Sequence, residues 1–262
     1  MSKVRDIKAV FFDIDGTLVS FTTHAVPESA RRAIAMLRER GIKVFIATGR
    51  LLRHTSVVQD IEVDGYITVN GGCCITSDGK TIFEQAHSQQ TVERMLDLAD
   101  EHGFALALLA EKNMYVRRLD GLAREMSQVV NIIPEEADLR HIAATQRVWQ
   151  MCPYIDAEME QKVLPMLPEC CGSRWIDSFM DVNVKGVDKS KAVQRVMEYY
   201  GYTMQQAMAF GDGGNDAPMV RDAAIGVAMG NGRDELKAVA DYVTDDVDND
   251  GVYNALKYFG LI

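Results

Sequence analysis

Cysteine is scarce in this sequence, and its spacing matches no cross-linked or zinc-binding pattern. The five cysteines are an odd number, and four of them form two adjacent pairs, Cys73-Cys74 and Cys170-Cys171. Disulfide frameworks and zinc sites use wider spacings, so we predict reduced, structural thiols in a cytoplasmic protein. A metal site built from one pair and a histidine is the alternative.

Long apolar segments are also missing. The richest run, Phe104–Ala110, is short, whereas a membrane helix needs about 20 apolar residues. The segment from Met1 to Lys8 lacks the apolar stretch and the cleavage site of a secretory signal. We therefore expect no membrane association and a cytoplasmic location.

Basic residues are outnumbered, with 28 Lys and Arg against 38 Asp and Glu and a formal net charge of −10. Nucleic-acid phosphates require clustered Lys and Arg, so we expect no nucleic-acid partner. A small anionic substrate stays compatible, because a local cationic pocket can form in an acidic protein. The 47% hydrophobic and 25% charged residues are typical of globular domains and exclude wholesale disorder. No segment indicates an obligatory protein partner.

Strand and helix patterns at both ends of the chain predict a parallel sheet. Lys8–Asp13 and Ile42–Ala47 are short apolar runs without polar alternation, as in strands covered on both faces. Pro27 begins a helix between them, and a helix after Asp188 followed by the strand Ala207–Phe210 repeats the pattern. We predict an α/β fold with a doubly wound, Rossmann-like parallel sheet, which binds ligands at the carboxyl ends of its strands.

The middle of the chain has a different, α+β pattern without such polar loops. Its predicted helices and strands are Thr91–His102, Gly121–Val130, Asp156–Leu164, Phe104–Ala110, Met114–Arg118, Arg147–Met151 and Met180–Val184. We predict a catalytic core of residues 1–82 and 184–262, with residues 83–183 inserted as a second domain.

Acidic residues gather at two predicted strand ends. Asp13 and Asp15 follow the first strand, where Gly16 allows a sharp turn, and Asp212 and Asp216 follow Ala207–Phe210. A lone Asp-x-Asp is usually a solvated loop. Here two loops at the carboxyl ends of strands supply acids, which favours a shared site.

Phosphoryl transfer explains this combination of residues. An aspartate can attack phosphorus and hold the phosphoryl group, although each pair of like charges 4 Å apart costs about 4 kcal/mol at a dielectric constant of 20. Mg²⁺ held by carboxylates and a backbone carbonyl relieves this repulsion. Thr48-Gly49-Arg50 and Lys189 offer the donors that phosphate oxygens need.

Lys189 stands in the first turn of the helix that Asp188 is predicted to cap. The helix dipole disfavours a cation there, so a neighbouring anion would explain this lysine. The alternative is that its side chain extends into solvent.

One acidic segment resembles a calcium loop only in part. Asp246, Asp248, Asp250 and Gly251 match the first half of an EF-hand loop, but Lys257 occupies the position that requires a bidentate Glu. We predict an acidic surface loop in which Asp250 caps the last helix.

Four segments resemble, in order, the four motifs of the haloacid dehalogenase (HAD) superfamily: Phe12–Leu18, Ala47–Arg50, Lys189 and Gly211–Asp216. The length of the insertion is similar to that of Cof-type phosphatases with an α+β (C2B) cap, and the resemblance covers the whole chain. Asn70–Gly72 and Val247–Gly251 also resemble segments of that subfamily.

The resemblance implies a role for each acid of the site. Asp13 would be the nucleophile, and Asp15 would protonate the leaving oxygen and then deprotonate the attacking water. Mg²⁺ would be bound by the Asp13 side chain, the Asp15 main-chain carbonyl and Asp212. Asp216 would lie in or beside this set of ligands.

The resemblance also implies which residues hold the phosphate, namely Thr48, the Gly49 N–H, Lys189 and Asn215. Arg50 would serve the substrate or the cap, and Lys191 is a second candidate for the lysine role. The candidate cap contacts are Arg117, Arg118, His141, Trp149 and Trp175, although a structural or surface role is the favoured interpretation for each of them.

The resemblance thus implies a Mg²⁺-dependent phosphatase that acts on small phosphate monoesters, above all hexose and other sugar phosphates. Phosphoryl-transfer ATPases of the same lineage lack an acid at the position of Asp15, so Asp15 favours hydrolysis of the intermediate. A phosphosugar mutase and a non-catalytic module that binds phosphate and metal are the alternatives.

Overall fold

The computed structural model describes residues 6–129 and 132–262, without the side chains of residues 129, 175 and 176. The chain forms two compact units. One contains the residues up to Glu84 together with Asp188–Ile262, and the other is Gln85–Val187. Phe83 and Glu84, which the sequence analysis assigns to the insertion, belong to a strand of the first unit, and residues 184–187, which it assigns to the core, belong to the second unit.

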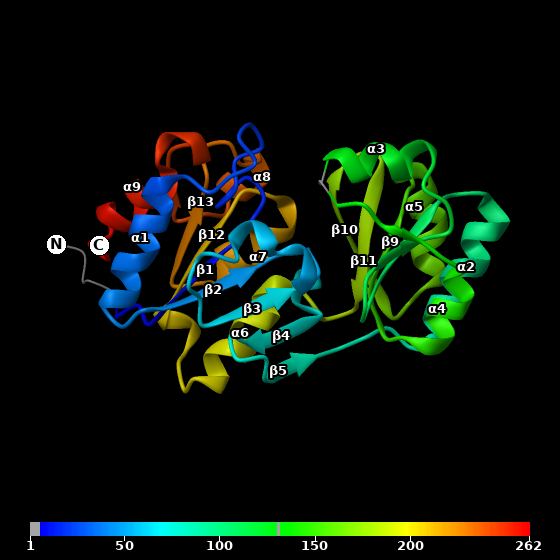
Figure 1. Cartoon of the computed structure of the whole chain (residues 1–262), viewed down its shortest axis with the longest axis horizontal. Coiled ribbons are helices and arrows are strands. Elements are labelled where there is room, and N and C mark those ends of the chain that lie inside the picture. The colour runs from blue at the N-terminus through cyan, green and yellow to red at the C-terminus, as the bar shows by residue number, and fades with distance from the viewer. Residues whose placement is uncertain (1–5, 130–131) are drawn as a thin grey trace. The chain divides into compact units, whose positions relative to one another are not determined.

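The first unit is built on an eight-stranded sheet with the order β14-β13-β12-β1-β2-β3-β4-β5 (Figure 1). The strands from β14 to β3 are parallel, and β4 and β5 extend the sheet as antiparallel strands. Their bounds are β1 Ala9–Phe12, β2 Lys43–Ala47, β3 Gly65–Thr68, β4 Cys73–Thr76, β5 Thr81–Glu84, β12 Ala207–Gly211, β13 Ile225–Ala228 and β14 Tyr242–Val243.

Helices cover both faces of this sheet because its central strands are apolar on both sides. In β1, Val10 and Phe12 pack in one hydrophobic cluster with α1 (Glu28–Glu39) and α9 (Gly251–Tyr258). Figure 1 shows these two helices side by side. Phe11, on the opposite face, packs in a second cluster with the helices α6 (Lys189–Tyr199), α7 (Ala217–Asp222) and α8 (Asp234–Lys237). The predicted doubly wound α/β core is confirmed.

The second unit has a six-stranded sheet with the order β10-β11-β9-β6-β7-β8. Its strands are β6 Leu106–Ala110, β7 Met114–Val116, β8 Glu135–Glu136, β9 Val148–Pro153, β10 Cys170–Ile176 and β11 Phe179–Val184. The helices α2 (Gln89–His102), α4 (Leu139–Thr145) and α5 (Ala157–Val163) share a hydrophobic cluster with this sheet, and α3 spans Gly121–Val129. Val130, the predicted end of that last helix, lies outside the described residues.

Several short elements are absent from the sequence prediction, namely β3, β4, β5, β8, β10 and α4. Most of them are too short or too polar for their periodicity to be recognised. In β10, for example, Gly172 and Arg174 interrupt the apolar pattern, and pairing with β11 supplies the stability. A strand of this kind depends on its neighbour more than on its own propensity.

The acidic segment near the C-terminus is an exposed loop, as predicted. Asp250 precedes α9 in the left-handed conformation, with a φ angle of 62°, and its side chain makes no capping hydrogen bond. The predicted cap is therefore wrong. An Asx cap requires extended backbone at the N-cap residue, which this conformation does not provide.

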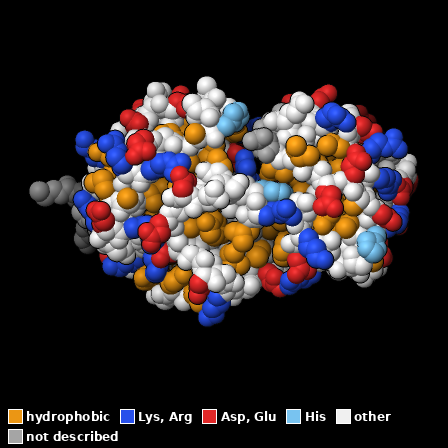
Figure 2. Space-filling view, in the orientation of Figure 1, with side chains coloured by type: hydrophobic (Ala, Val, Ile, Leu, Met, Phe, Trp, Pro, Cys, Tyr) orange, Lys and Arg blue, Asp and Glu red, His pale blue; other side chains and the backbone are white. Residues whose placement is uncertain are grey.

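None of the helices within residues 6–129 and 132–262 has both the length and the apolar composition needed to cross a membrane. Figure 2 shows acidic and basic side chains interspersed over the viewed face of each unit. All five cysteines are free thiols.

Candidate active site

Three neighbouring parallel strands end at the same edge of the first unit's sheet. Asp13 follows β1, Thr48 follows β2 and Asp212 follows β12, and β1 lies between the other two strands. The helix that follows β1 packs on one face of the sheet, and the helix that follows β12 packs on the other. The site therefore lies at the point where the strand order reverses, which is the binding position of open α/β sheets.

The turn after β1 brings its residues against the β12 loop. Gly16 has a φ angle of 82°, and its N–H donates to the Val19 carbonyl at 2.8 Å. A Cβ at Gly16 would lie 2.3 Å from Asp212 Oδ2. Only glycine therefore permits this close approach. Thr17 Oγ1 donates to Asp212 Oδ1 at 3.1 Å and holds the carboxylate in place.

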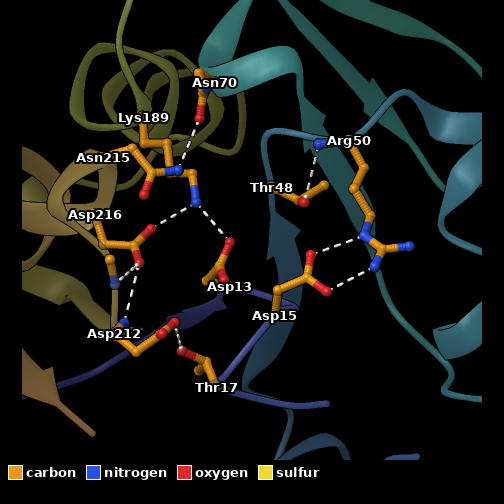
Figure 3. Close-up of polar contacts among 11 residues, drawn as sticks. Asp13, Asp15, Thr17, Thr48, Arg50, Asn70, Lys189, Asp212, Asn215 and Asp216 are labelled. Atoms are coloured by element: carbon orange, nitrogen blue, oxygen red, sulfur yellow. Dashed lines mark hydrogen bonds and ion pairs between the residues drawn. The ribbon is translucent and has the colours of Figure 1, made fainter. Parts of the chain in front are cut away.

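Lys189 is the first residue of α6, and its side chain is fully buried. Asp188 caps the helix by accepting a hydrogen bond from the Lys191 N–H at 2.8 Å. Lys189 Nζ donates to Asp13 Oδ1 at 2.6 Å and to Asp216 Oδ1 at 2.5 Å (Figure 3). The lysine thus points to anions and not to solvent.

The two carboxylates decide the charge of that lysine. Burial alone would lower the pKa of Lys189, but Asp13 and Asp216 raise it above its ordinary value. Lys189 is therefore a permanent cation in the centre of the site.

Asp216 organises the loop after β12. Its Oδ2 accepts hydrogen bonds from the N–H groups of Asp212 at 3.0 Å and Gly213 at 2.9 Å, while its Oδ1 accepts from Lys189. The residue is fully buried. Its carboxylate therefore fixes both the loop and the lysine.

Asp13, Asp212 and Asp216 form an acidic group that fits a hard cation. Each offers one oxygen, and these oxygens lie within 4.8 Å of one another. With all three carboxylates ionised, the Lys189 ammonium leaves two negative charges without compensation. Mg²⁺ prefers oxygen ligands and would balance that charge.

Burial and neighbouring charges raise the pKa values of two of these acids. Burial raises the pKa of Asp13 to about 7 against the opposing effect of Lys189, and Asp216 and Asp15 add to the rise. Burial, with the charges of Asp13 and Asp216, raises the pKa of Asp212 well above its usual range. A bound divalent cation would therefore favour the ionised form of both carboxylates.

Asp15 belongs to a separate ion pair. Arg50 Nε donates to Asp15 Oδ2 at 2.7 Å and Nη2 donates to Oδ1 at 2.6 Å, while Nη1 donates to the His54 carbonyl at 3.0 Å. Figure 3 shows the Asp15 carboxylate directed toward Arg50 and the Asp13 carboxylate directed toward Lys189. The sequence analysis did not predict this pair.

The predicted phosphate ligands lie on both sides of Asp13 and are linked by Asn70. Asn215 Nδ2 donates to Asn70 Oδ1 at 3.0 Å, and the Asn70 N–H donates to the Thr48 carbonyl at 3.1 Å. A Cβ at Gly49 would lie 3.3 Å from the Asn70 amide group. Asn70 is buried with a φ angle of 54°, which asparagine tolerates better than most residues. The sequence analysis gave Asn70 no role, although an Asn-Gly-Gly segment indicates backbone with positive φ angles.

The remaining candidates belong to other elements. Lys191, the second candidate for the lysine role, is exposed on α6. In the second unit, Arg117 pairs with Asp100 and His141 is exposed, whereas the buried Trp149 Nε1 has no hydrogen-bond partner. Arg118 is also exposed and lies 3.7 Å from Asp120. The Trp175 side chain lies outside the described part of the chain.

Known proteins share this sequence and fold over nearly the whole chain. The sequence profile of the haloacid dehalogenase-like hydrolases matches residues 10–256. A putative phosphatase of Bacillus subtilis, YkrA, is 32% identical over 98% of this chain and 99% of its own length. The 5-amino-6-(5-phospho-D-ribitylamino)uracil phosphatase YcsE of Bacillus subtilis is 28% identical over 98% of this chain and 97% of its own.

Solved structures agree with the sequence comparisons. BT1666 of Bacteroides thetaiotaomicron, a HAD phosphatase, superposes with a TM-score of 0.93 at 40% identity, over 98% of this chain and 97% of its own. The HAD subclass IIB sugar phosphatase BT4131 superposes with a TM-score of 0.89 at 38% identity, over 97% of this chain and 100% of its own. The chain therefore belongs to the haloacid dehalogenase-like hydrolases, as a phosphatase of the Cof type.

Proposed function

We propose that this phosphatase hydrolyses small phosphate monoesters, most specifically sugar phosphates, through a phosphorylated Asp13 and with Mg²⁺ as cofactor. The observation that carries the proposal is the arrangement around Asp13. Its carboxylate follows β1, accepts a hydrogen bond from the buried Lys189 and lies in one group with Asp212 and Asp216. An aspartate beside a fixed cation is suited to attack an anion that it would otherwise repel.

The reaction has two steps in this proposal. In the first, an Asp13 oxygen bonds to phosphorus, the bond from phosphorus to the leaving oxygen breaks, and Asp15 gives that oxygen a proton. In the second, a water oxygen bonds to phosphorus, the bond from phosphorus to Asp13 breaks, and the water proton passes to Asp15. Inorganic phosphate leaves, and both acids return to their starting forms.

The phosphate oxygens would be held by the Thr48 hydroxyl, the Gly49 N–H, Lys189 and the Asn215 amide. Support comes from their common location at the ends of β2 and β12 and at the start of α6. The link from Asn215 through Asn70 to Thr48 fixes these donors before substrate arrives. Donors fixed in advance stabilise developing charge without reorganisation.

The Asp13 and Asp212 carboxylates and the Asp15 carbonyl would hold the Mg²⁺, with Asp216 beside them. When bound, the ion supplies charge neutralisation for the approach of the phosphate. Asp216 is less available as a ligand, because its oxygens already accept three hydrogen bonds.

A sugar phosphate as substrate is supported by the relatives. BT4131, 38% identical, is described as a sugar phosphatase. YcsE is described as a phosphatase of a phosphoribitylamino-uracil. We further propose that the second unit, Gln85–Val187, acts as the α+β cap domain, since it is inserted between β5 and α6 of the core. A cytoplasmic location stays a prediction.

Asp13→Asn tests the nucleophile. We expect phosphate release from p-nitrophenyl phosphate with Mg²⁺ to fall by at least about 10⁴-fold, since an amide cannot form the intermediate. Asp248→Asn, which makes the same change on the exposed C-terminal loop, should keep wild-type activity. Release from Asp13→Asn at the wild-type rate would refute the assignment.

A panel of phosphorylated metabolites tests the substrate class and the alternatives. Hexose and pentose phosphates should give stoichiometric inorganic phosphate. Isomerised sugar phosphate without free phosphate would favour a mutase. Binding of phosphate and Mg²⁺ without turnover of any compound would favour a non-catalytic module.

A further inference from the structure

We propose that Arg50 is a positioning residue for Asp15, fixing the carboxylate that transfers the proton. The inference rests on the proposed function, because Asp15 exchanges protons with the leaving group and with water only in that reaction. It is carried by the geometry of the Asp15–Arg50 ion pair and by its separation from the ion pairs of Lys189.

Two cations pair with three of the acids of the site. Lys189 donates to Asp13 and Asp216, whereas Arg50 donates to Asp15. Asp13 and Asp15 lie on one turn, so an unrestrained Asp15 side chain would compete with Asp13 for the ammonium group. Arg50 prevents this by holding Asp15 on the side of Thr48, as Figure 3 shows.

Arg50 is itself fixed in place. Its Nη1 donates to the His54 carbonyl at 3.0 Å, and its Nε and Nη2 donate to the two oxygens of Asp15 at 2.7 and 2.6 Å. Its side chain is only 14% exposed. A guanidinium group presents these donors in one rigid plane, so the plane of the Asp15 carboxylate is fixed as well. A lysine at position 50 would keep the charge and lose this orientation.

Orientation matters most when the phosphorylated Asp13 is hydrolysed. The water proton must reach an Asp15 oxygen as the water oxygen bonds to phosphorus and the bond to Asp13 breaks. A misplacement of about 1 Å can cost about 100-fold in rate. Phosphorylation by p-nitrophenyl phosphate depends less on Asp15, because its leaving group departs without a proton. Arg50 variants should therefore affect the two steps unequally.

Quench-flow with p-nitrophenyl phosphate and Mg²⁺ separates the two steps. In Arg50→Lys and Arg50→Met we expect hydrolysis of the phosphoenzyme to slow by about 10- to 100-fold, while its formation changes by less than about 3-fold. Phosphoenzyme then accumulates. Arg195→Met removes an arginine whose side chain is 60% exposed on α6 and should change neither rate.

A double-mutant cycle decides whether Arg50 acts through Asp15. In the Asp15→Asn background, the Arg50 substitutions should slow hydrolysis no further, because the group they position is gone. Additive losses in the rate of phosphoenzyme hydrolysis would overturn the proposal. The proposal would also fail if Arg50→Lys hydrolysed the phosphoenzyme at the wild-type rate, or if the Arg50 variants changed only KM. If thermal unfolding shows that Arg50→Met is not folded, Arg50→Lys completes the cycle. A wild-type enzyme that forms no phosphoenzyme would instead refute the proposed function.

Discussion

Lys189 carries its positive charge in a fully buried position, and two carboxylates surround it. Removing one partner of a buried ion pair leaves the others uncompensated, which costs far more than losing a surface pair. Asp212 lies in the same acidic group, and burial with the charges of Asp13 and Asp216 raises its pKa. We therefore expect the stability of the core to depend on cations at this site. A bound divalent ion and Lys189 should therefore partly replace each other.

Lys189→Met tests this dependence. At pH 8, we expect a loss of about 3–5 kcal/mol in the free energy of unfolding without metal. Millimolar Mg²⁺ should reduce that loss, because the ion binds the folded acids and not the unfolded chain. Urea unfolding with chelator and with Mg²⁺ measures both values.

Lys191→Met is the matched control, since Lys191 lies on the same helix and is exposed. It should lose less than about 0.5 kcal/mol in either condition. Equal losses for Lys189→Met with and without Mg²⁺ would contradict a cation site at these acids.

His87 gives the second unit a dependence on pH. Burial lowers its pKa to about 4 from an ordinary 6.5, and its Nε2 lies 3.1 Å from the Val182 carbonyl. Between these values the unfolded chain binds a proton that the folded chain excludes. Stability attributable to His87 is therefore present above pH 6.5 and is lost as the pH falls toward 4.

His87→Gln should remove the pH dependence of stability that His87 causes. We expect the wild type to lose about 2 kcal/mol more than the variant between pH 7.5 and pH 5, as measured by urea unfolding at both values. Comparison with the variant cancels the titration of the carboxylates. Parallel stability curves for the two proteins would show that His87 does not contribute.

At the scale of elements, the packing of α7 on β13 depends on a glycine. A Cβ at Gly226 would lie 1.9 Å from the Val220 carbonyl oxygen, which is backbone and cannot move aside. Gly226 pairs with Ala209 of β12, the strand that leads to Asp212. A substitution here therefore displaces a strand or a helix that supports the site.

Gly226→Ala should destabilise the protein by about 3 kcal/mol or more, measured by urea unfolding. Gly260→Ala separates this clash from backbone strain, because Gly260 has a φ angle of 71° and no atom within 4 Å of the added Cβ. We expect it to cost only about 1–2 kcal/mol. Similar losses in the two variants would argue against the clash.

At the scale of the whole molecule, no hydrophobic cluster of the described residues is shared: two belong to the first unit and one to the second. The cluster of the second unit joins its sheet with α2, α4 and α5. The unit is also continuous in sequence, from Gln85 to Val187. A contiguous segment with its own core is expected to fold independently.

A fragment of residues 85–187 should therefore fold alone. We expect the far-ultraviolet circular dichroism of a mixed α/β fold and a cooperative thermal transition, without release of phosphate from p-nitrophenyl phosphate. The full chain carrying Asp13→Asn is the matched inactive control. A fragment with the spectrum of an unfolded chain would show that the second unit needs the first.

The sequence by itself determined the doubly wound core and the positions of the candidate site residues along it. Short apolar runs without polar alternation are typical of strands covered on both faces, and the polar residues directly after such strands meet at one edge of a parallel sheet. Asp13, Thr48 and Asp212 were located in this way. Strands such as β10 were missed, because they owe their conformation to a partner strand.

Only the tertiary structure decided which charges meet. Lys189 and Asp13 are 176 positions apart, and Asn215 and Asn70 are 145 apart. Even Asp15 and Arg50, 35 positions apart, sit on separate loops. Hydrogen bonds act over about 3 Å, so their partners follow from how strands and helices pack and not from spacing along the chain.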